Sequence, residues 1–238
     1  MSITPEPMSL GEACLRIFFT PARVFDRRAE SGFAAPLLVV LAFVGLFAYG
    51  AGPYLAPVLD AEFARSTAAT MRQNPRLTAE QLQHMRDLGE KFAIPAAIAG
   101  TAVAVLAVAF TILVVANALG GTLPLHAAFV LATFAAFPKT LAIAASGIVA
   151  AARDPSRIAG VYSVTLGPAF FLDPATTSPI PLTLAARLDV FTIWCTILVA
   201  IGLHRIARLS TPSAIAGAAI VWLVGSLPTL LSVLRTAA

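Results

Sequence analysis

The fold is decided by residues 92–138, FAIPAAIAGTAVAVLAVAFTILVVANALGGTLPLHAAFVLATFAAFP, which contain no Asp, Glu, Lys or Arg. A helix needs about 20 apolar residues to cross a bilayer, so these 47 residues are long enough for two crossings. Gly120, Gly121 and Pro124 mark a break between the two halves, and a turn this short joins antiparallel neighbours. The stretch therefore predicts a helical hairpin embedded in a membrane.

The composition of the whole chain extends this prediction. Of the 238 residues, 58% are hydrophobic and 12% are charged, against about 25% charged in soluble domains, and the mean hydropathy is +0.86. We expect an all-α membrane protein in which residues 32–236 form one domain of five transmembrane helices. The predicted spans are about 34–57, 92–119, 125–152, 184–203 and 212–234, and Pro36 fits the first turn of the first one.

Residues 1–31 are expected to form a separate N-terminal segment. Leu10, Cys14 and Ile17 lie at helical spacing, and Thr20 and Pro21 suit the N-cap and first position of a second short helix. This amphipathic pattern favours helices that lie on the membrane surface, and the alternative is helices packed on the protein's own loops.

Residues 58–91 are expected to form a helical hairpin outside the bilayer. They carry five basic and five acidic residues, which largely cancel. Thr78 and Gln81 match a capping box at the start of the second arm. The apolar residues of that arm follow one stripe, which consists of Leu82, Met85, Leu88 and Phe92.

Several classes of chemistry have no support in the sequence. The two cysteines, Cys14 and Cys195, do not form a disulfide framework or a Cys-based metal site. Phosphate-binding glycine motifs and a nucleophile elbow are both missing. The net charge of +4 is spread along the chain, which suits loops near anionic lipid and not a nucleic-acid patch. We therefore expect a protein without enzymatic activity, cofactor or metal.

The orientation in the membrane is left open by the charges. Five spans place the two termini on opposite sides, and basic residues number 4, 0 and 2 on the N-terminal side against 5, 3 and 1 on the other. The positive-inside rule counts basic residues alone, so this distribution does not favour an N-terminus inside the cell.

Four stretches carry a resemblance to a known family: FFTPARVFDRRAESGFAAPLL (18–38), LTAEQLQHMRDLGEKFAIPAAIAG (77–100), FAAFPKTLAIAASGIVAAARDP (134–155) and LDVFTIWCTILVAIGLHRIARLST (188–211). Over roughly residues 15–230 the chain resembles the bacterial branch of the Yip family of membrane proteins, whose eukaryotic members bind Ypt/Rab GTPases. The motif residues include Pro36, Phe191, Trp194 and Gly202. The resemblance implies a five-helix domain in the bacterial inner membrane with a cytoplasmic N-terminus.

Lys139 is the most unusual residue of the predicted spans, since a charged side chain at the centre of a membrane helix costs roughly 2.5–3.5 kcal/mol on insertion scales. It lies 15 residues after Pro124, and Asp189 lies 15 residues before His204, so both are about 22 Å from the side of the short turns. We therefore expect Lys139 and Asp189 to form a structural ion pair. Snorkelling of Lys139 to the interface and a role in transport are the alternatives.

The expected function is that of a scaffold or adaptor that binds lipids and an unidentified membrane or cytosolic protein, with a homo-oligomer as one possibility. The alternative is a small transporter or channel subunit that uses Lys139 and Asp189. Transport needs a continuous polar path through the spans. Asn117 is the third candidate polar residue for such a path, beside the two charged residues.

Overall fold

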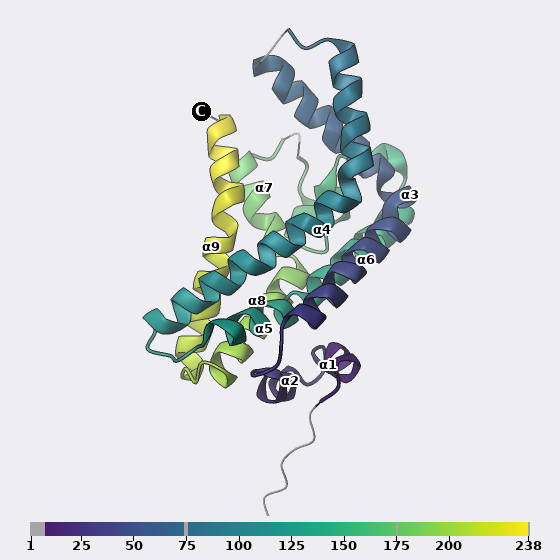
Figure 1. Cartoon of the computed structure of the whole chain (residues 1–238). Coiled ribbons are helices and arrows are strands. Elements are labelled where there is room, and N and C mark those ends of the chain that lie inside the picture. Colours follow the sequence, from purple (N-terminus) through teal and green to yellow (C-terminus); the bar gives the residue numbers. More distant parts are fainter. Residues whose placement is uncertain (1–7, 74–75, 175, 238) are drawn as a thin grey trace, which may run out of the picture. The chain divides into compact units, whose positions relative to one another are not determined.

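The structure is a computed structural model that describes residues 8–73, 76–174 and 176–237; the first seven residues of the predicted N-terminal segment lie outside this part. The described residues form helices and turns, with no strand among them (Figure 1). The α-helices are α1 (Leu10–Arg16), α2 (Pro21–Arg28), α3 (Ala34–Gln73), α4 (Ala79–Ala118), α5 (Leu125–Ala135), α6 (Phe137–Ala151), α7 (Pro179–Ala186), α8 (Val190–Arg205) and α9 (Thr211–Ala237).

The helices are long and apolar enough for a membrane protein with several spans. Four stretches of the described chain qualify by length and hydropathy, and these are Ala34–Ala68, Ala79–Ala118, Leu125–Ala151 and Thr211–Leu234. Helices α7 and α8 qualify together as a fifth span, with a bend of 59° between them. The predicted fold class, an all-α membrane protein with up to five spans, is confirmed.

Two of the predicted spans are interrupted. The third, about 125–152, is divided at Ala136 into α5 and α6, because Pro138 has no amide hydrogen to donate to the carbonyl four residues earlier. The fourth predicted span, about 184–203, is not one helix. Its first residues belong to α7, and the continuous helix begins at Val190. The intervening residues Arg187 to Asp189 are not helical.

The chain divides into two compact units. Unit 1 comprises Met1–Phe43, Thr101–Thr140 and Phe191–Ala238, and unit 2 comprises Val44–Gly100 and Leu141–Val190.

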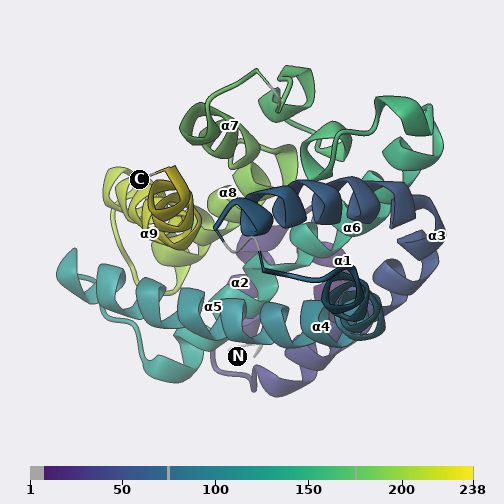
Figure 2. The ribbon, with the colours of Figure 1, turned by 90° about the horizontal axis from the view of Figure 1, so that it is seen from above.

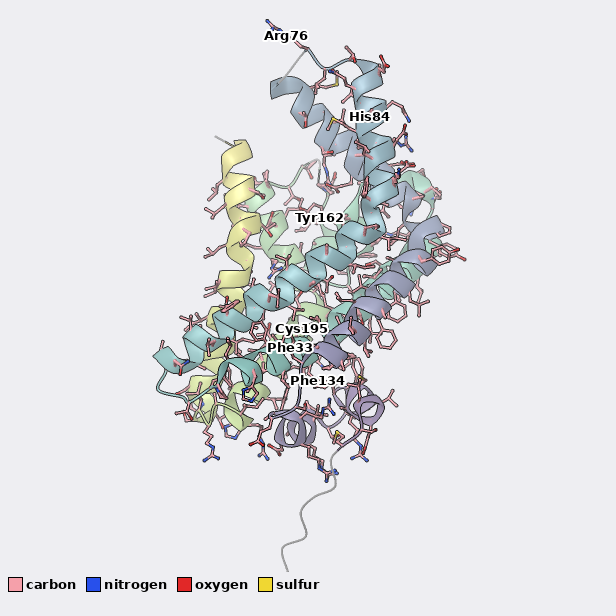
Figure 3. All side chains as sticks on the ribbon, in the orientation of Figure 1. Phe33, Arg76, His84, Phe134, Tyr162 and Cys195 are labelled. Carbon is pink, nitrogen blue, oxygen red and sulfur yellow. The ribbon has the colours of Figure 1, made fainter. Side chains whose placement is uncertain are left out.

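Helix α5 forms the centre of unit 1. Every residue from 127 to 135 is buried. Of the most apolar 18-residue stretch of the span that contains α5, 67% is buried, against 22–28% for the other three long spans. Aromatic rings surround it: Phe33 stacks on Phe129 at 4.8 Å, and Phe134 stacks on Phe137 at 5.7 Å between ring centroids (Phe33 and Phe134 are labelled in Figure 3). A helix that is apolar on all sides can be surrounded by lipid or by protein, and here the protein itself covers residues 127–135.

The turn between α4 and α5 is short, as expected, and is held by backbone hydrogen bonds. Gly120 has φ +80°, and the amides of Gly120 and Gly121 donate to the carbonyls of Asn117 and Ala116, the pattern of a Schellman cap. The amide of Thr122 donates to the carbonyl of Ala207 at 3.2 Å. A Cβ on Gly121 would lie 2.9 Å from that same carbonyl oxygen, so glycine permits the close approach.

Unit 2 contains the expected hairpin, made by the end of α3 and the start of α4. The capping box is confirmed, since the amide of Gln81 donates to Thr78 Oγ1 at 3.2 Å and the amide of Thr78 donates to Gln81 Oε1 at 2.9 Å. Arg86 joins the arms by donating to Asp60 at 2.6 Å. Short turns and α7 fill the connection between α6 and α8 (Figure 2), where Arg153 lies 4.2 Å above the ring of Phe170.

Gly202 permits α8 to approach α5, and its replacement should destabilise unit 1. An added Cβ would lie 2.5 Å from Cγ and Cδ1 of Leu131, which is fully buried. We expect Gly202→Ala to lower the free energy of unfolding by about 1–3 kcal/mol, as overpacking does in cores, measured by thermal unfolding in detergent micelles.

Gly100→Ala is the matched control, because an added Cβ at this helical position meets no atom within 4 Å. Helix propensity predicts a gain of up to about 1 kcal/mol there. Equal changes in the free energy of unfolding of the two variants would contradict a destabilising contact of the added Cβ with Leu131.

Candidate functional site

Lys139 lies in the first turn of α6 and contacts α8 within unit 1. Its Nζ donates a hydrogen bond to Oγ1 of Thr192 at 2.8 Å, and Thr192 is only 8% exposed. Thr196 Oγ1 in turn donates to the Thr192 carbonyl at 2.8 Å. Thr192 is not among the residues predicted to contact Lys139, because the two are 53 positions apart and sequence spacing gives no signal of the contact.

Asp189 lies directly before α8, at the position where Asp is favoured as a helix cap. It is 6% exposed, and within unit 2 its backbone packs closely on Gly167, where an added Cβ would lie 2.9 Å from the Asp189 Cα. The amide of Val190 donates to the Leu166 carbonyl at 3.1 Å and fixes this entry to the helix. A buried carboxylate requires hydrogen-bonding or charged partners. The pairing of Asp189 with Lys139 therefore stays a prediction.

The remaining predicted polar residue, Asn117, lies in the last turn of α4. Its Nδ2 donates to the carbonyl of Leu113 in the same helix at 2.8 Å, and its side chain is exposed. Of the motif residues, Pro36 is buried in the first turn of α3, and Phe191 lies in the first turn of α8, partly exposed.

Trp194 holds the N-terminal segment on unit 1. Phe18, between α1 and α2, meets Trp194 and Phe137 edge to face, with centroid distances of 5.4 and 6.4 Å. Ile17 and Phe25 have no exposed surface. The segment therefore packs on helices α6 and α8 and not on loops, and its location at the membrane surface stays a prediction.

The outer side of the same segment is also apolar in part. Leu15 and Phe19 are 69% and 83% exposed, as residues of an interfacial segment would be in the absence of lipid. The segment is thus attached to unit 1 by one face and presents large apolar side chains on the other.

Polar contacts complete the attachment. The guanidinium of Arg205 at the end of α8 donates through Nε and Nη2 to the two carboxylate oxygens of Asp26 in α2, with Nε to Oδ1 at 2.8 Å. Arg28 Nη1 donates to the Met8 carbonyl at 3.2 Å. Burial raises the pKa of the Cys14 thiol in α1, so little of it is the reactive thiolate at neutral pH.

The hairpin of unit 2 carries exposed apolar side chains beside its charges. Met85, Leu88 and Phe92 lie on one side of α4 and are 42–51% exposed. His84 and Arg76, labelled in Figure 3, mark the polar part of the hairpin. Among the described residues there is no group of three or more His, Cys, Asp and Glu side chains that could hold a metal ion.

The predicted ion pair can be tested by charge reversal. We expect Lys139→Asp and Asp189→Lys each to destabilise the protein by about 2–4 kcal/mol, because each leaves two like charges in an apolar environment, and the double variant to recover most of the loss. Thermal unfolding in detergent measures all three. The pairing would be contradicted if the double variant lost as much stability as the two single variants together. It would also be contradicted if Lys139→Met left the stability unchanged.

The attachment of the N-terminal segment can be followed through Cys14 in a protein whose other cysteine is replaced by Cys195→Ser. Phe18→Ala removes the ring contacts to Trp194 and Phe137, so we expect maleimide to label Cys14 several-fold faster, as measured by intact mass in lipid nanodiscs. Phe19→Ala removes an exposed ring of the same size and is the control. Equal acceleration by both variants would contradict the proposed attachment.

Comparison with known proteins bears on the whole of this arrangement. A search of curated proteins and a search of solved structures gave no match. The family model described as the Yip1 domain matches residues 15–232, which include the N-terminal segment from Leu15 onward and the residues Lys139, Asp189 and Trp194. The chain is therefore a multi-pass membrane protein of the Yip1 family.

Proposed function

We propose that this protein is a non-enzymatic scaffold or adaptor of the bacterial inner membrane, with a cytoplasmic N-terminus, that binds a partner protein through its α3–α4 hairpin. The observation that carries the proposal is the length of the two helices. Each has 40 residues, about twice what a bilayer crossing requires, so each extends into water.

The surface of the hairpin supports a binding role. Charged residues keep it soluble, yet Met85, Leu88 and Phe92 expose large apolar surface on one side of α4. Exposed apolar residues grouped on one helix face are typical of a surface that docks another helix, and methionine adapts to partners of different shape. A second copy of this chain is one such partner.

A second candidate, a small transporter or channel subunit, is favoured by one observation. α5 and α6 form an interrupted helix, and so do α7 and α8, and discontinuous helices form the substrate sites of many transporters. Lys139 begins one of the continuing halves and Asp189 precedes the other. Uptake of a solute into proteoliposomes that is lost in Lys139→Met would favour this candidate over the scaffold.

Site-specific photocrosslinking in native membranes tests the scaffold proposal. A benzophenone amino acid at Met85 should give a crosslinked product of defined mass, because this side chain lies on the proposed docking face. The same group at Gln83 should give none, since the Gln83 side chain is on the opposite face, where it donates to Asp87 at 2.8 Å.

Leu88→Asp should weaken partner binding, since burying a carboxylate in an apolar interface costs free energy. It should abolish the product from position 85, whereas Gln83→Asp should leave it intact. Products of equal yield from positions 83 and 85, or none from position 85, would contradict the proposal.

A further inference from the structure

A groove of about 710 Å³ runs along α8 and α9 within unit 1, which is a volume typical of ligand sites. Its walls are small or apolar: Ala200 and Ile201 on α8, Ala218 and Ala219 on α9, and Ala22 on α2. Along α8 the lining residues run from Thr196 to His204, which corresponds to about 12 Å. The groove starts at the α8–α9 turn and continues toward the middle of both helices.

The end of the groove at the α8–α9 turn is basic. His204 and Arg205 line it, and α2, which contributes the lining residue Ala22, also carries the exposed residues Arg23 and Arg27. Nδ1 of His204 lies 2.8 Å from the Leu209 carbonyl, which can only accept, so Nδ1 carries the proton and donates to it. Asp26, the acidic residue at this end that α2 supplies, pairs with Arg205.

We propose that this groove binds one acyl chain of an anionic phospholipid, with the phosphate at Arg205. The length agrees, since a groove of about 12 Å with its basic end at the turn can hold the upper part of a chain in one leaflet's hydrocarbon layer of about 15 Å. The turn that carries the basic residues ends two membrane helices and so lies at headgroup level. Charge complementarity selects a phosphate-bearing anionic lipid over a zwitterionic one.

The pair of Arg205 with Asp26 gives the site a further property. An anionic headgroup competes with Asp26 for the same guanidinium, so the carboxylate opposes lipid binding while it attaches α2 to α8. Removal of the carboxylate should therefore leave lipid binding intact or strengthen it, whereas removal of the guanidinium should weaken it. This site is separate from the hairpin and does not depend on the scaffold role.

Native mass spectrometry of the full chain in detergent, with dioleoylphosphatidylglycerol or dioleoylphosphatidylcholine added, tests the proposal. We expect one tightly retained phosphatidylglycerol and weaker retention of phosphatidylcholine. Ala219→Trp fills the groove from an exposed position and should lower phosphatidylglycerol retention about tenfold. Ala216→Trp, exposed on the same helix and outside the groove, should not.

Two charge variants test the headgroup assignment. Arg205→Gln should reduce the preference for phosphatidylglycerol about fivefold, since a basic residue near an anionic surface contributes about 1 kcal/mol. Asp26→Asn should maintain or raise that preference. Equal effects of the two tryptophan variants, an equal loss in both charge variants, or loss of a protein dimer in Ala219→Trp with lipid retention unchanged would each overturn the proposal.

Discussion

The structure of unit 1 depends on the burial of residues 127–135 of α5. These nine consecutive residues are apolar except for Thr133, and their burial shows that protein neighbours, and not lipid, surround them. Those neighbours come from distant parts of the chain: Phe33 stacks on Phe129, Gly202 admits Leu131, and Phe110 meets Phe129 edge to face at 5.5 Å. Close packing then replaces the hydrophobic effect, which gives little drive for association between helices in lipid.

Three of the four motif residues, Phe191, Trp194 and Gly202, lie in α8. Gly202 lets α8 contact α5 closely, while Trp194, two turns earlier on α8, receives Phe18 from the N-terminal segment. Arg205 then fixes α2 to the end of α8. The same helix thus contacts the buried centre on one side, holds the segment on another and lines the groove that we assign to a lipid.

The sequence predicted those features that local patterns determine. Uncharged windows located the spans, Gly120 and Gly121 located the turn before α5, and Thr78 with Gln81 located the start of α4. The interruptions at Ala136 and before Val190 were less visible, because a helix break in lipid depends on neighbours that satisfy the freed backbone groups. The hydrogen bond from Lys139 to Thr192 and the ring contact of Phe18 with Trp194 join segments far apart in sequence, which spacing alone does not reveal.

The covering of residues 127–135 of α5 by protein can be tested without substitution. A diazirine reagent dissolved in the lipid phase labels side chains that face lipid, and mass spectrometry of the labelled peptides locates them. We expect no label at residues 127–135 of α5 and strong label at Leu223, Leu227 and Leu231 of α9, which are 49–55% exposed. Label on α5 at the level of α9, repeating with the period of a helix, would contradict it.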